Sequence, residues 1–122
     1  MKKVYLSDAG PKVSPAIYGF WRWEKEDKKM DEIVHFCLDK GINTFDHSDR
    51  YGQYTAEKSF GELLAKKSIQ RSDIVLFSKC GVNIPSPARP DIRVAHVNTS
   101  ADHITASVEN SLRNLQTDYL DV

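Results

Sequence analysis

The sequence predicts an α/β fold of the (β/α)8 TIM-barrel type, here only the amino-terminal hairpin and about the first three to four βα units. Amphipathic helical stretches alternate with short β-type runs, a pattern that forms a parallel sheet through right-handed crossovers. A charge-dense loop, residues 46–52, directly follows the second strand, where barrel folds carry their active-site loops. A whole barrel takes roughly 250 residues. The 122 residues therefore predict one domain, 1–122, truncated inside an apparent fourth strand.

Composition and charge argue against several classes of partner. Lysine plus arginine and aspartate plus glutamate are equal at 17 each, so no basic field attracts nucleic acid or an anionic membrane. Hydrophobic residues make up 40% and charged residues 28%, as is ordinary for a soluble domain. The apolar runs are too short to span a bilayer, and the amino terminus lacks the apolar core of a signal peptide. The two cysteines form no C-x-x-C pair, which favours a cytoplasmic location.

The amino-terminal part of the chain predicts a hairpin, a strand and a helix. Residues 4–6 and 12–14 flank a turn that contains glycine and proline, as the arms of a hairpin do. Residues 16–21 predict a first buried strand, and the charged stretch 24–29 opens a helix that Gly41 ends as a carboxyl-terminal cap. The apolar face of this helix has i, i+3, i+4 spacing and consists of Met30, Ile33, Val34, Cys37 and Leu38.

Two further strands follow, with a helix between them. Residues 42–45 predict the second strand and residues 74–78 the third. The helix spans about residues 55–67, and its apolar face consists of Phe60, Leu63 and Leu64.

The last part of the chain predicts a long loop, a helix and the start of a strand. Residues 80–99 carry three prolines and no periodicity, so we expect a mobile loop that helps to define the substrate. Thr99 or Ser100 caps the helix, and residues 119–122 begin the fourth strand. One face of this helix combines Ile104, Val108, Ser111, Leu112 and Leu115.

The polar ends of the second and third strands predict a proton-transfer site. Asp46 follows one strand and Lys79 ends the next. Neighbouring parallel strands lie roughly 4.8 Å apart, so the two side chains are expected to meet. The carboxylate keeps the ammonium charged, and the ammonium favours loss of a proton from the phenol of Tyr51. Such a trio suits protonation of a carbonyl oxygen while another group delivers a hydride.

With these features the chain resembles the aldo-keto reductases, NAD(P)H-dependent carbonyl reductases on a (β/α)8 barrel whose bottom is closed by a hairpin. The resemblance covers the whole chain and the amino-terminal half of the family. It rests on residues 41–52, 73–79 and 107–121, which occur in the family's order. Residues 18–21 and 78–81 look like those of bacterial reductases.

The resemblance implies roles for individual residues. Tyr51 matches the proton donor, and Lys79 and Asp46 match the pair that tunes it. The implied cofactor is NADP (NADPH), no metal is implied, and the cofactor-binding residues are Gly19, Phe20, Trp21 and Asp46. The implied reaction is reduction of an aldehyde or ketone, a small carbonyl substrate, to an alcohol. The family's catalytic histidine would fall after Val122, so we expect the 122-residue chain alone to be inactive.

The sequence leaves two other classes of function open. One is a non-catalytic interaction or regulatory protein on the same fold, as the β subunits of potassium channels are. The presence of Asp46, Tyr51 and Lys79 favours the enzyme, because a scaffold has no use for the three together. The other is a phosphate-binding isomerase on a barrel, which gives no reason for Tyr51 beside Lys79.

Several nearby side chains have a plainer interpretation than a catalytic one. Tyr54 is interpreted as packing. His47 either points away from the site or contacts substrate, and it has no partners for a metal. His96 either lines the substrate pocket or is a solvated loop residue. Cys80 has no evident base beside it to make it a nucleophile.

A partial barrel leaves strand edges and one face of the sheet uncovered. We expect Ile17, Phe45, Val75 and Phe77 to meet water at that face, at roughly 1.5–3 kcal/mol each. Net stabilities are only about 5–15 kcal/mol. The sequence therefore predicts that residues 1–122 are no stable, active monomer, and that they belong to a longer polypeptide or self-associate through the open side.

Overall fold

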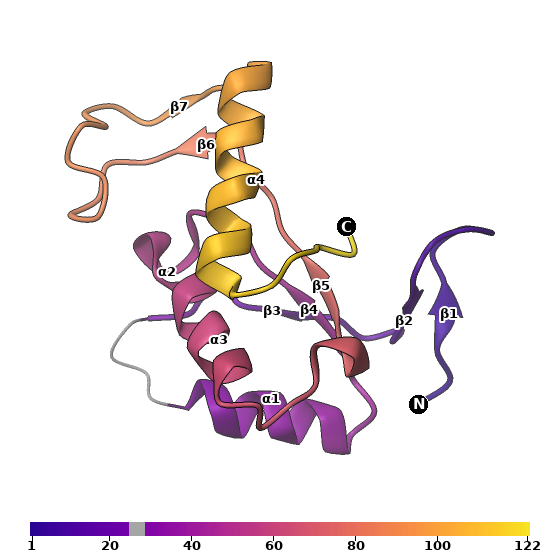
Figure 1. Cartoon of the computed structure of the whole chain (residues 1–122). Helices are drawn as coiled ribbons and strands as arrows, with labels where there is room; N and C mark the ends of the chain where they lie inside the picture. Colours follow the sequence, from indigo (N-terminus) through magenta and orange to yellow (C-terminus); the bar gives the residue numbers. More distant parts are fainter. Residues whose placement is uncertain (25–28) are drawn as a thin grey trace.

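The centre of the molecule is a parallel sheet with helices packed on one face (Figure 1). The computed structural model describes residues 1–24 and 29–122. The central sheet contains, in order, β3 (Tyr18–Gly19), β4 (Thr44–Asp46) and β5 (Val75–Phe77). The helices are α1 (Met30–Asp39), α2 (Tyr51–Tyr54), α3 (Ala56–Ala65) and α4 (Ala101–Leu115), and a 3-10 turn, η1 (Arg71–Asp73), precedes β5.

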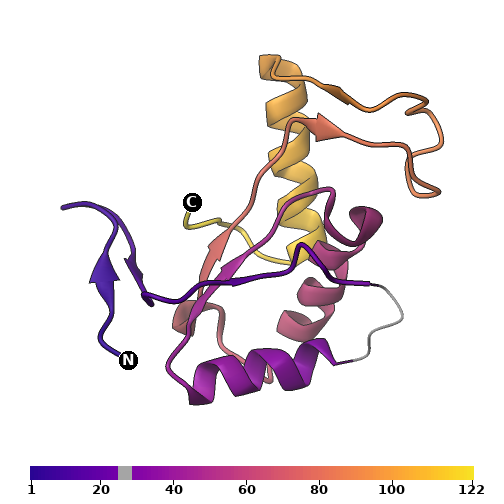
Figure 2. The same cartoon turned by 180° about the vertical axis from the view of Figure 1, so that it is seen from behind.

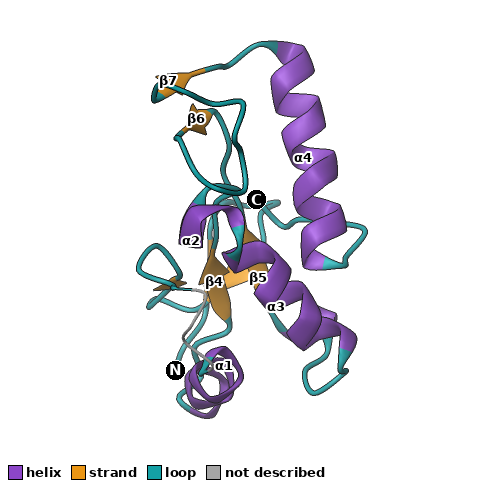
Figure 3. Cartoon of the chain, turned by 90° about the vertical axis from the view of Figure 1, so that its left-hand side faces the viewer, coloured by secondary structure: helices purple, strands orange, loops and turns teal. Residues whose placement is uncertain are grey.

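The predicted alternation of parallel strands and helices is confirmed. Strand β4 pairs in parallel with both β3 and β5. Helix α3 lies against the sheet, with α1 and α4 at its two ends (Figures 1 and 3). The described residues form an open sheet and no closed barrel. None of the helices in this part of the chain is long and apolar enough to cross a membrane.

Two small antiparallel pairs stand at opposite ends of the molecule (Figure 2). Strands β1 (Val4–Tyr5) and β2 (Lys12–Val13) form the predicted hairpin. Strands β6 (Val82–Asn83) and β7 (His96–Val97) form a ribbon inside the stretch predicted to be an unstructured loop. That prediction was wrong because two-residue arms are too short to give a periodic pattern. The prolines lie between the arms, where no ladder hydrogen bond is lost.

The hydrophobic core lies between the sheet and the helices. Phe45 and Leu76 are register partners in β4 and β5, and both are fully buried. The ring of Phe45 lies 5.6 Å, centroid to centroid, from that of Phe60 on α3. Because side chains alternate along a strand, Asp46 and Phe77, also register partners, point to the opposite face.

The prediction that four apolar side chains meet water at the open face was wrong for two of them. Phe45 is 0% exposed because it points toward the helices. Val75 is 7% exposed, since the hairpin and the carboxyl-terminal segment lie beside it. Ile17 is 45% exposed and Phe77 is partly exposed. The open face is therefore less apolar than expected, and self-association through it stays a prediction.

Helix α1 begins at Met30, later than predicted. Glu24 lies outside the helix, and residues 25–28 lie outside the described part of the chain. The predicted apolar face is confirmed, with Met30, Val34 and Cys37 buried and Ile33 and Leu38 packed against the core. Gly41 ends the helix as predicted: its φ is +78°, a left-handed conformation that glycine adopts without strain, and its N–H donates to the Leu38 carbonyl at 2.9 Å.

Helix α4 begins as predicted but buries only part of the predicted face, Ser111 and Leu115. Ser100 caps it, because its Oγ accepts a hydrogen bond from the His103 N–H at 3.3 Å. Ile104 and Val108, predicted to be buried, are 42% and 40% exposed. The buried residues of α4 are Ser107, Ser111 and Leu115.

Close contact between α3 and α4 explains this small, polar face. A Cβ on Gly61 would lie 1.9 Å from the Asn114 carbonyl oxygen, so the two backbones touch there. Glu57 of α3 is buried one turn away from Gly61. Serine side chains fit where larger apolar ones would force the helices apart.

Residues 119–122 run beside β5 as an extended segment rather than the predicted regular strand. The Asp121 N–H donates to the Leu76 carbonyl at 3.1 Å, and the Ser78 N–H donates to the Val122 carbonyl at 3.1 Å. Too few ladder hydrogen bonds form for a strand, but the segment takes a strand's place at the edge of the sheet.

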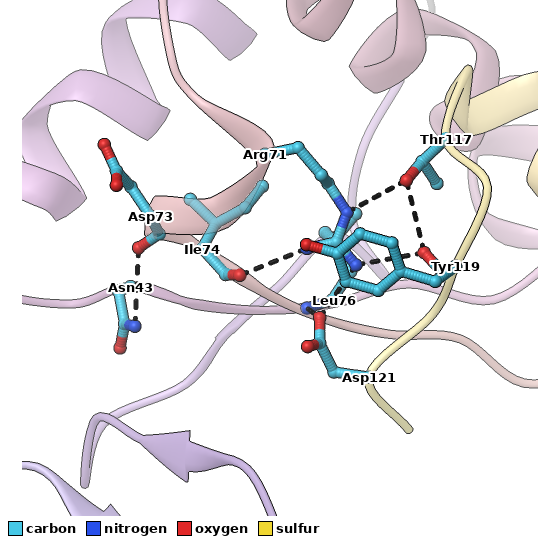
Figure 4. A network of polar contacts seen from close by, with 8 residues as sticks. All are labelled: Asn43, Arg71, Asp73, Ile74, Leu76, Thr117, Tyr119 and Asp121. Atoms are coloured by element: carbon cyan, nitrogen blue, oxygen red, sulfur yellow. Dashed lines mark hydrogen bonds and ion pairs between the residues drawn. The ribbon is translucent and has the colours of Figure 1, made fainter.

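Arg71 fastens this segment to the sheet (Figure 4). Its guanidinium lies 3.8 Å from the centroid of the Tyr119 ring. It donates hydrogen bonds to Thr117 Oγ1 at 3.1 Å, the Tyr119 carbonyl at 3.0 Å and Asp121 Oδ2 at 2.8 Å. Asp121 Oδ2 also accepts from the Leu76 N–H at 2.9 Å. One arginine thus links η1, β5 and the carboxyl-terminal segment.

Candidate active site

Asp46 and Lys79 meet at the carboxyl edge of the sheet, as their positions predict. Asp46 ends β4, and Lys79 follows β5 by two residues. The Lys79 ammonium donates a hydrogen bond to Asp46 Oδ1 and another to the His47 carbonyl oxygen at 2.7 Å. The side chains of Lys79 and Asp46 are 50% and 27% exposed. The ion pair is therefore held in place by the main chain of His47 and is partly open to solvent.

Tyr51 comes to the same place from α2. Lys79 Nζ lies 5.0 Å from the centroid of the Tyr51 ring. The Tyr51 N–H donates to the Ser48 carbonyl at 3.1 Å, which begins the turn. At Gly52 the chain has a φ of +57°, and a Cβ there would lie 2.9 Å from Trp23 Cδ1. Glycine is required at this turn, and the turn places the tyrosine beside the lysine.

The backbone of Lys79 is also held by the loop after β4. Its carbonyl oxygen accepts hydrogen bonds from Ser48 Oγ at 3.1 Å and from the Asp49 N–H at 3.0 Å. With both ends of Lys79 bonded to the loop after β4, the ammonium has little freedom to leave Asp46. Such support of a charged side chain by its neighbours is typical of a preorganised site.

His47 lies on the other side of β4, inside the aromatic core. Its ring stacks on Phe20, with 4.6 Å between centroids and 15° between planes, and meets Phe60 edge-on at 4.7 Å. Burial, reinforced by the positive charge of Lys79, lowers the pKa of His47 to about 3. His47 is 0% exposed. The sequence left two positions open for the His47 side chain. The position pointing away from the site is confirmed, and the fully buried ring is not accessible to a substrate.

A buried carboxylate behind the site was missed by the sequence analysis. Glu57 is 2% exposed, and its Oε1 accepts a hydrogen bond from Ser78 Oγ at 2.7 Å. Burial raises the pKa of Glu57, and the hydrogen bonds from Ser78 and Ser111 oppose that rise. Burial likewise raises the pKa of Asp49. The spacing of Glu57 with Phe60 and Leu64, i, i+3 and i+7, was the signal that could have revealed it.

A groove of about 820 Å³ opens beside Tyr51. Trp21 lines it and is 60% exposed, with the Arg22 guanidinium 4.3 Å from the centroid of its ring. The buried Trp23 forms part of the wall, and Ile84 contributes from the β6–β7 ribbon. Two tryptophans beside a tyrosine in the lining of a groove suit a small, partly apolar molecule.

The residues expected to contact a cofactor separate into two groups. A Cβ on Gly19 would lie 3.6 Å from Asp46 Oδ2, and Trp21 is exposed in the groove, so both adjoin the site. The Phe20 side chain is 2% exposed and its N–H is already bonded to the Asp46 carbonyl at 3.0 Å. The Phe20 ring lies in the core, so the side chain is not exposed to a cofactor, and a contact through its main chain stays a prediction.

Tyr54, His96 and Cys80, the other side chains considered near the site, lie outside the contacts that join Asp46, Lys79 and Tyr51. Tyr54 packs against the ribbon as predicted: its hydroxyl accepts from the Ile84 N–H at 2.8 Å and donates to the Ile84 carbonyl at 3.2 Å. His96 is exposed, with Nδ1 2.9 Å from the Val94 carbonyl, and it lies outside the groove beside Tyr51. Burial raises the pKa of the Cys80 thiol, which agrees with an unreactive cysteine.

The chain has a parallel sheet with an aspartate, a lysine and a tyrosine near its carboxyl edge. Comparison with known proteins identifies the family, a class of oxidoreductases. The family model for the Aldo/keto reductase family matches residues 16–122. The chain therefore belongs to the aldo-keto reductases. It is 46% identical over 125 residues to the oxidoreductase YcsN of Bacillus subtilis, covering 100% of this chain and 41% of that protein.

Other relatives extend the comparison. The 6-dehydroglucose reductase of Agrobacterium fabrum is 36% identical over 126 residues, covering 100% of this chain and 42% of that enzyme. The aldo-keto reductase AKR11C1 from Bacillus halodurans, solved in its holo form, superposes with a TM-score of 0.82 at 32% identity, covering 98% of this chain and 38% of that one. The chain thus spans about two fifths of the relatives that it matches.

Proposed function

We propose that this chain supplies the proton-donating part of an NAD(P)H-dependent reductase that converts aldehydes or ketones to alcohols. The observation that carries the proposal is the position of the Lys79 ammonium, which is bonded to Asp46 and lies 5.0 Å from the Tyr51 ring centroid. The family supports it, since aldo-keto reductases reduce carbonyl compounds with nicotinamide cofactors.

In this mechanism Tyr51 is the general acid. Its hydroxyl gives a proton to the carbonyl oxygen of the substrate as negative charge develops there. The adjacent ammonium of Lys79 stabilises the phenolate that remains, and Asp46 holds that ammonium charged and oriented. The aromatic wall at Trp21 orients the substrate and limits the access of water.

The residues around the site fit a nicotinamide cofactor. Gly19 has no side chain to fill the space near Asp46, and Trp21 is exposed beside it, so a flat ring has an open approach. Gly19, Trp21 and Asp46 are the proposed contacts, and the cofactor when bound supplies the hydride. NADPH rather than NADH is proposed from the family resemblance alone.

The test is a pair of tyrosine variants in the protein expressed from its whole gene. Tyr51→Phe should lower kcat for aldehyde reduction by about 10²–10⁴-fold, the usual share of a general acid, and leave cofactor binding nearly unchanged. Tyr5→Phe, in the amino-terminal hairpin and 65% exposed, is the matched control. A Tyr51→Phe enzyme with more than about a tenth of the original kcat would show that Tyr51 is not the acid. Fluorescence titration with both reduced cofactors decides between NADPH and NADH.

A second candidate is a regulatory subunit on the same fold. The chain is 31% identical over 120 residues to a probable voltage-gated potassium channel subunit beta of Arabidopsis thaliana, covering 96% of this chain and 34% of that protein. This candidate is favoured if the protein binds the reduced cofactor but does not oxidise it with any of a panel of aldehydes and ketones.

A further inference from the structure

A second cleft, separate from the groove beside Tyr51, lies between the β6–β7 ribbon and the first turn of α4. Its volume is about 470 Å³, and the two concave sites share no lining residue. Asn83 and His96 are register partners in the ribbon, so their side chains share one face of it. His103 lines the cleft from the first turn of α4.

The basic side chains that line this cleft favour the binding of an anion. Arg89 and Arg93 line it together with the two histidines, and Asp91 is the acidic residue among its lining. The Arg89 guanidinium lies 4.7 Å from the centroid of the Tyr54 ring. This cation–π contact limits the movement of the arginine side chain. The first turn of a 15-residue helix adds partial positive charge from its main-chain N–H groups.

A buried polar group points to a ligand rather than to a merely basic surface. Asn83 is 5% exposed, and its side-chain Nδ2 has no hydrogen-bond partner among the described residues. A buried amide donor without an acceptor is costly, so native structures nearly always satisfy it. The His103 N–H is already bonded to Ser100 Oγ and the Ser100 N–H to Asn98 Oδ1. Asn83 lines the cleft, and its buried Nδ2 is a donor that an acceptor on a bound ligand would satisfy.

We propose that this cleft binds the phosphate group of a small phosphorylated molecule. Arginine recognises phosphate through paired N–H donors, and the amide of Asn83 supplies a further donor at the wall. A bare phosphate leaves most of the cleft empty, so a phosphate monoester with a small organic part fits it better than the inorganic ion. Binding here does not depend on the reaction proposed for Tyr51, because neither Tyr51, Lys79 nor Asp46 lines the cleft.

The test is titration of the purified, isotope-labelled protein with inorganic phosphate and, separately, with glycerol phosphate at constant ionic strength. The side-chain NH2 signal of Asn83 and the imidazole signals of His96 and His103 are followed by NMR. Saturable shifts confined to this cleft are expected. Tighter binding of glycerol phosphate identifies a monoester as the ligand, and equal affinities identify inorganic phosphate.

Two arginine variants test the specificity of the site. Arg93→Gln should weaken binding about tenfold or more, the effect of losing a charge-assisted hydrogen bond. Arg113→Gln removes the same charge from the far end of α4, outside the cleft, and should leave the affinity unchanged. Asn83→Asp should abolish binding, because it places a carboxylate against the phosphate. Absence of saturable shifts at millimolar phosphate, or equal losses in the two arginine variants, would overturn the proposal.

Discussion

The carbonyl oxygen of His47 accepts a hydrogen bond from Lys79 Nζ at 2.7 Å, while the imidazole of the same residue stacks on Phe20 inside the core. The main-chain carbonyl of His47 therefore positions Lys79 in the candidate site, while its side chain packs in the core. Because the ring is locked between aromatic neighbours, the carbonyl is fixed as well. Lys79 has two acceptors, one charged and one neutral, and the neutral one does not depend on Asp46.

This arrangement predicts unequal effects of removing the two members of the ion pair. Lys79→Met removes the charge beside Tyr51 and should lower kcat about 10²-fold or more. Asp46→Asn should cost less, since the His47 carbonyl still holds the ammonium in place. Steady-state kinetics on the two variants measure this, with Lys58→Met on the exposed side of α3 as the control. A larger loss in Asp46→Asn than in Lys79→Met would contradict the role given to the carbonyl.

The buried His47 predicts a specific dependence of stability on pH. Its pKa in the folded state is about 3 against an ordinary value of 6.5, so the unfolded state binds the proton more tightly. The stabilisation is complete above about pH 6.5 and falls as the pH drops toward about 3. The slope for this one group is at most about 1.4 kcal/mol per pH unit. Glu57 and Asp49 have raised pKa values and contribute with the opposite sign.

A comparison with His47→Phe isolates the histidine, because both proteins share the same carboxylates. Urea unfolding between pH 5 and 8 should show the original protein losing free energy of unfolding relative to the variant as the pH falls below about 6.5. Phenylalanine keeps the stack on Phe20 and the edge-on contact with Phe60. Parallel stability curves across that range would show that the imidazole is not the titrating group.

The hydrogen bonds from Arg71 to residues 117–121, here called the Arg71 clamp, are predicted to stabilise the edge of the sheet. Arg71→Met leaves Asp121 without its charged partner and removes the hydrogen bonds to Thr117 and Tyr119. The free energy of unfolding should fall by about 2–3 kcal/mol, typical of hydrogen bonds to charged groups. Arg71→Lys should recover only part of it, since an ammonium lacks the fork of donors. Denaturant unfolding measures both, and an effect no larger than that of the exposed Arg113→Met would refute the clamp.

The sequence predicted the elements that carry strong local signals and missed those that depend on tertiary contact. The apolar face of α1 and the cap at Gly41 follow from spacing and from backbone conformation, and the meeting of Asp46 with Lys79 follows from parallel pairing. The buried face of α4 followed only in part: Ser111 and Leu115 are buried as predicted, but Val108 on the same predicted face is exposed. Packing against α3 selects small side chains instead.

The contact between α3 and α4 gives the last prediction. Alanine is favoured over glycine within a helix by about 1 kcal/mol, so Gly61→Ala should stabilise the protein if helix propensity decided the outcome. The added Cβ would lie 1.9 Å from the Asn114 carbonyl oxygen, which is backbone and cannot turn aside. The helices must separate, and overpacking of this kind costs about 1–3 kcal/mol. We therefore expect Gly61→Ala to lower the free energy of unfolding. Gly19→Ala is the matched control, because its Cβ finds ordinary contacts at 3.5 and 3.6 Å. Urea unfolding of the two variants measures the difference, and a more stable Gly61→Ala protein would show that the helices are not in backbone contact at this point.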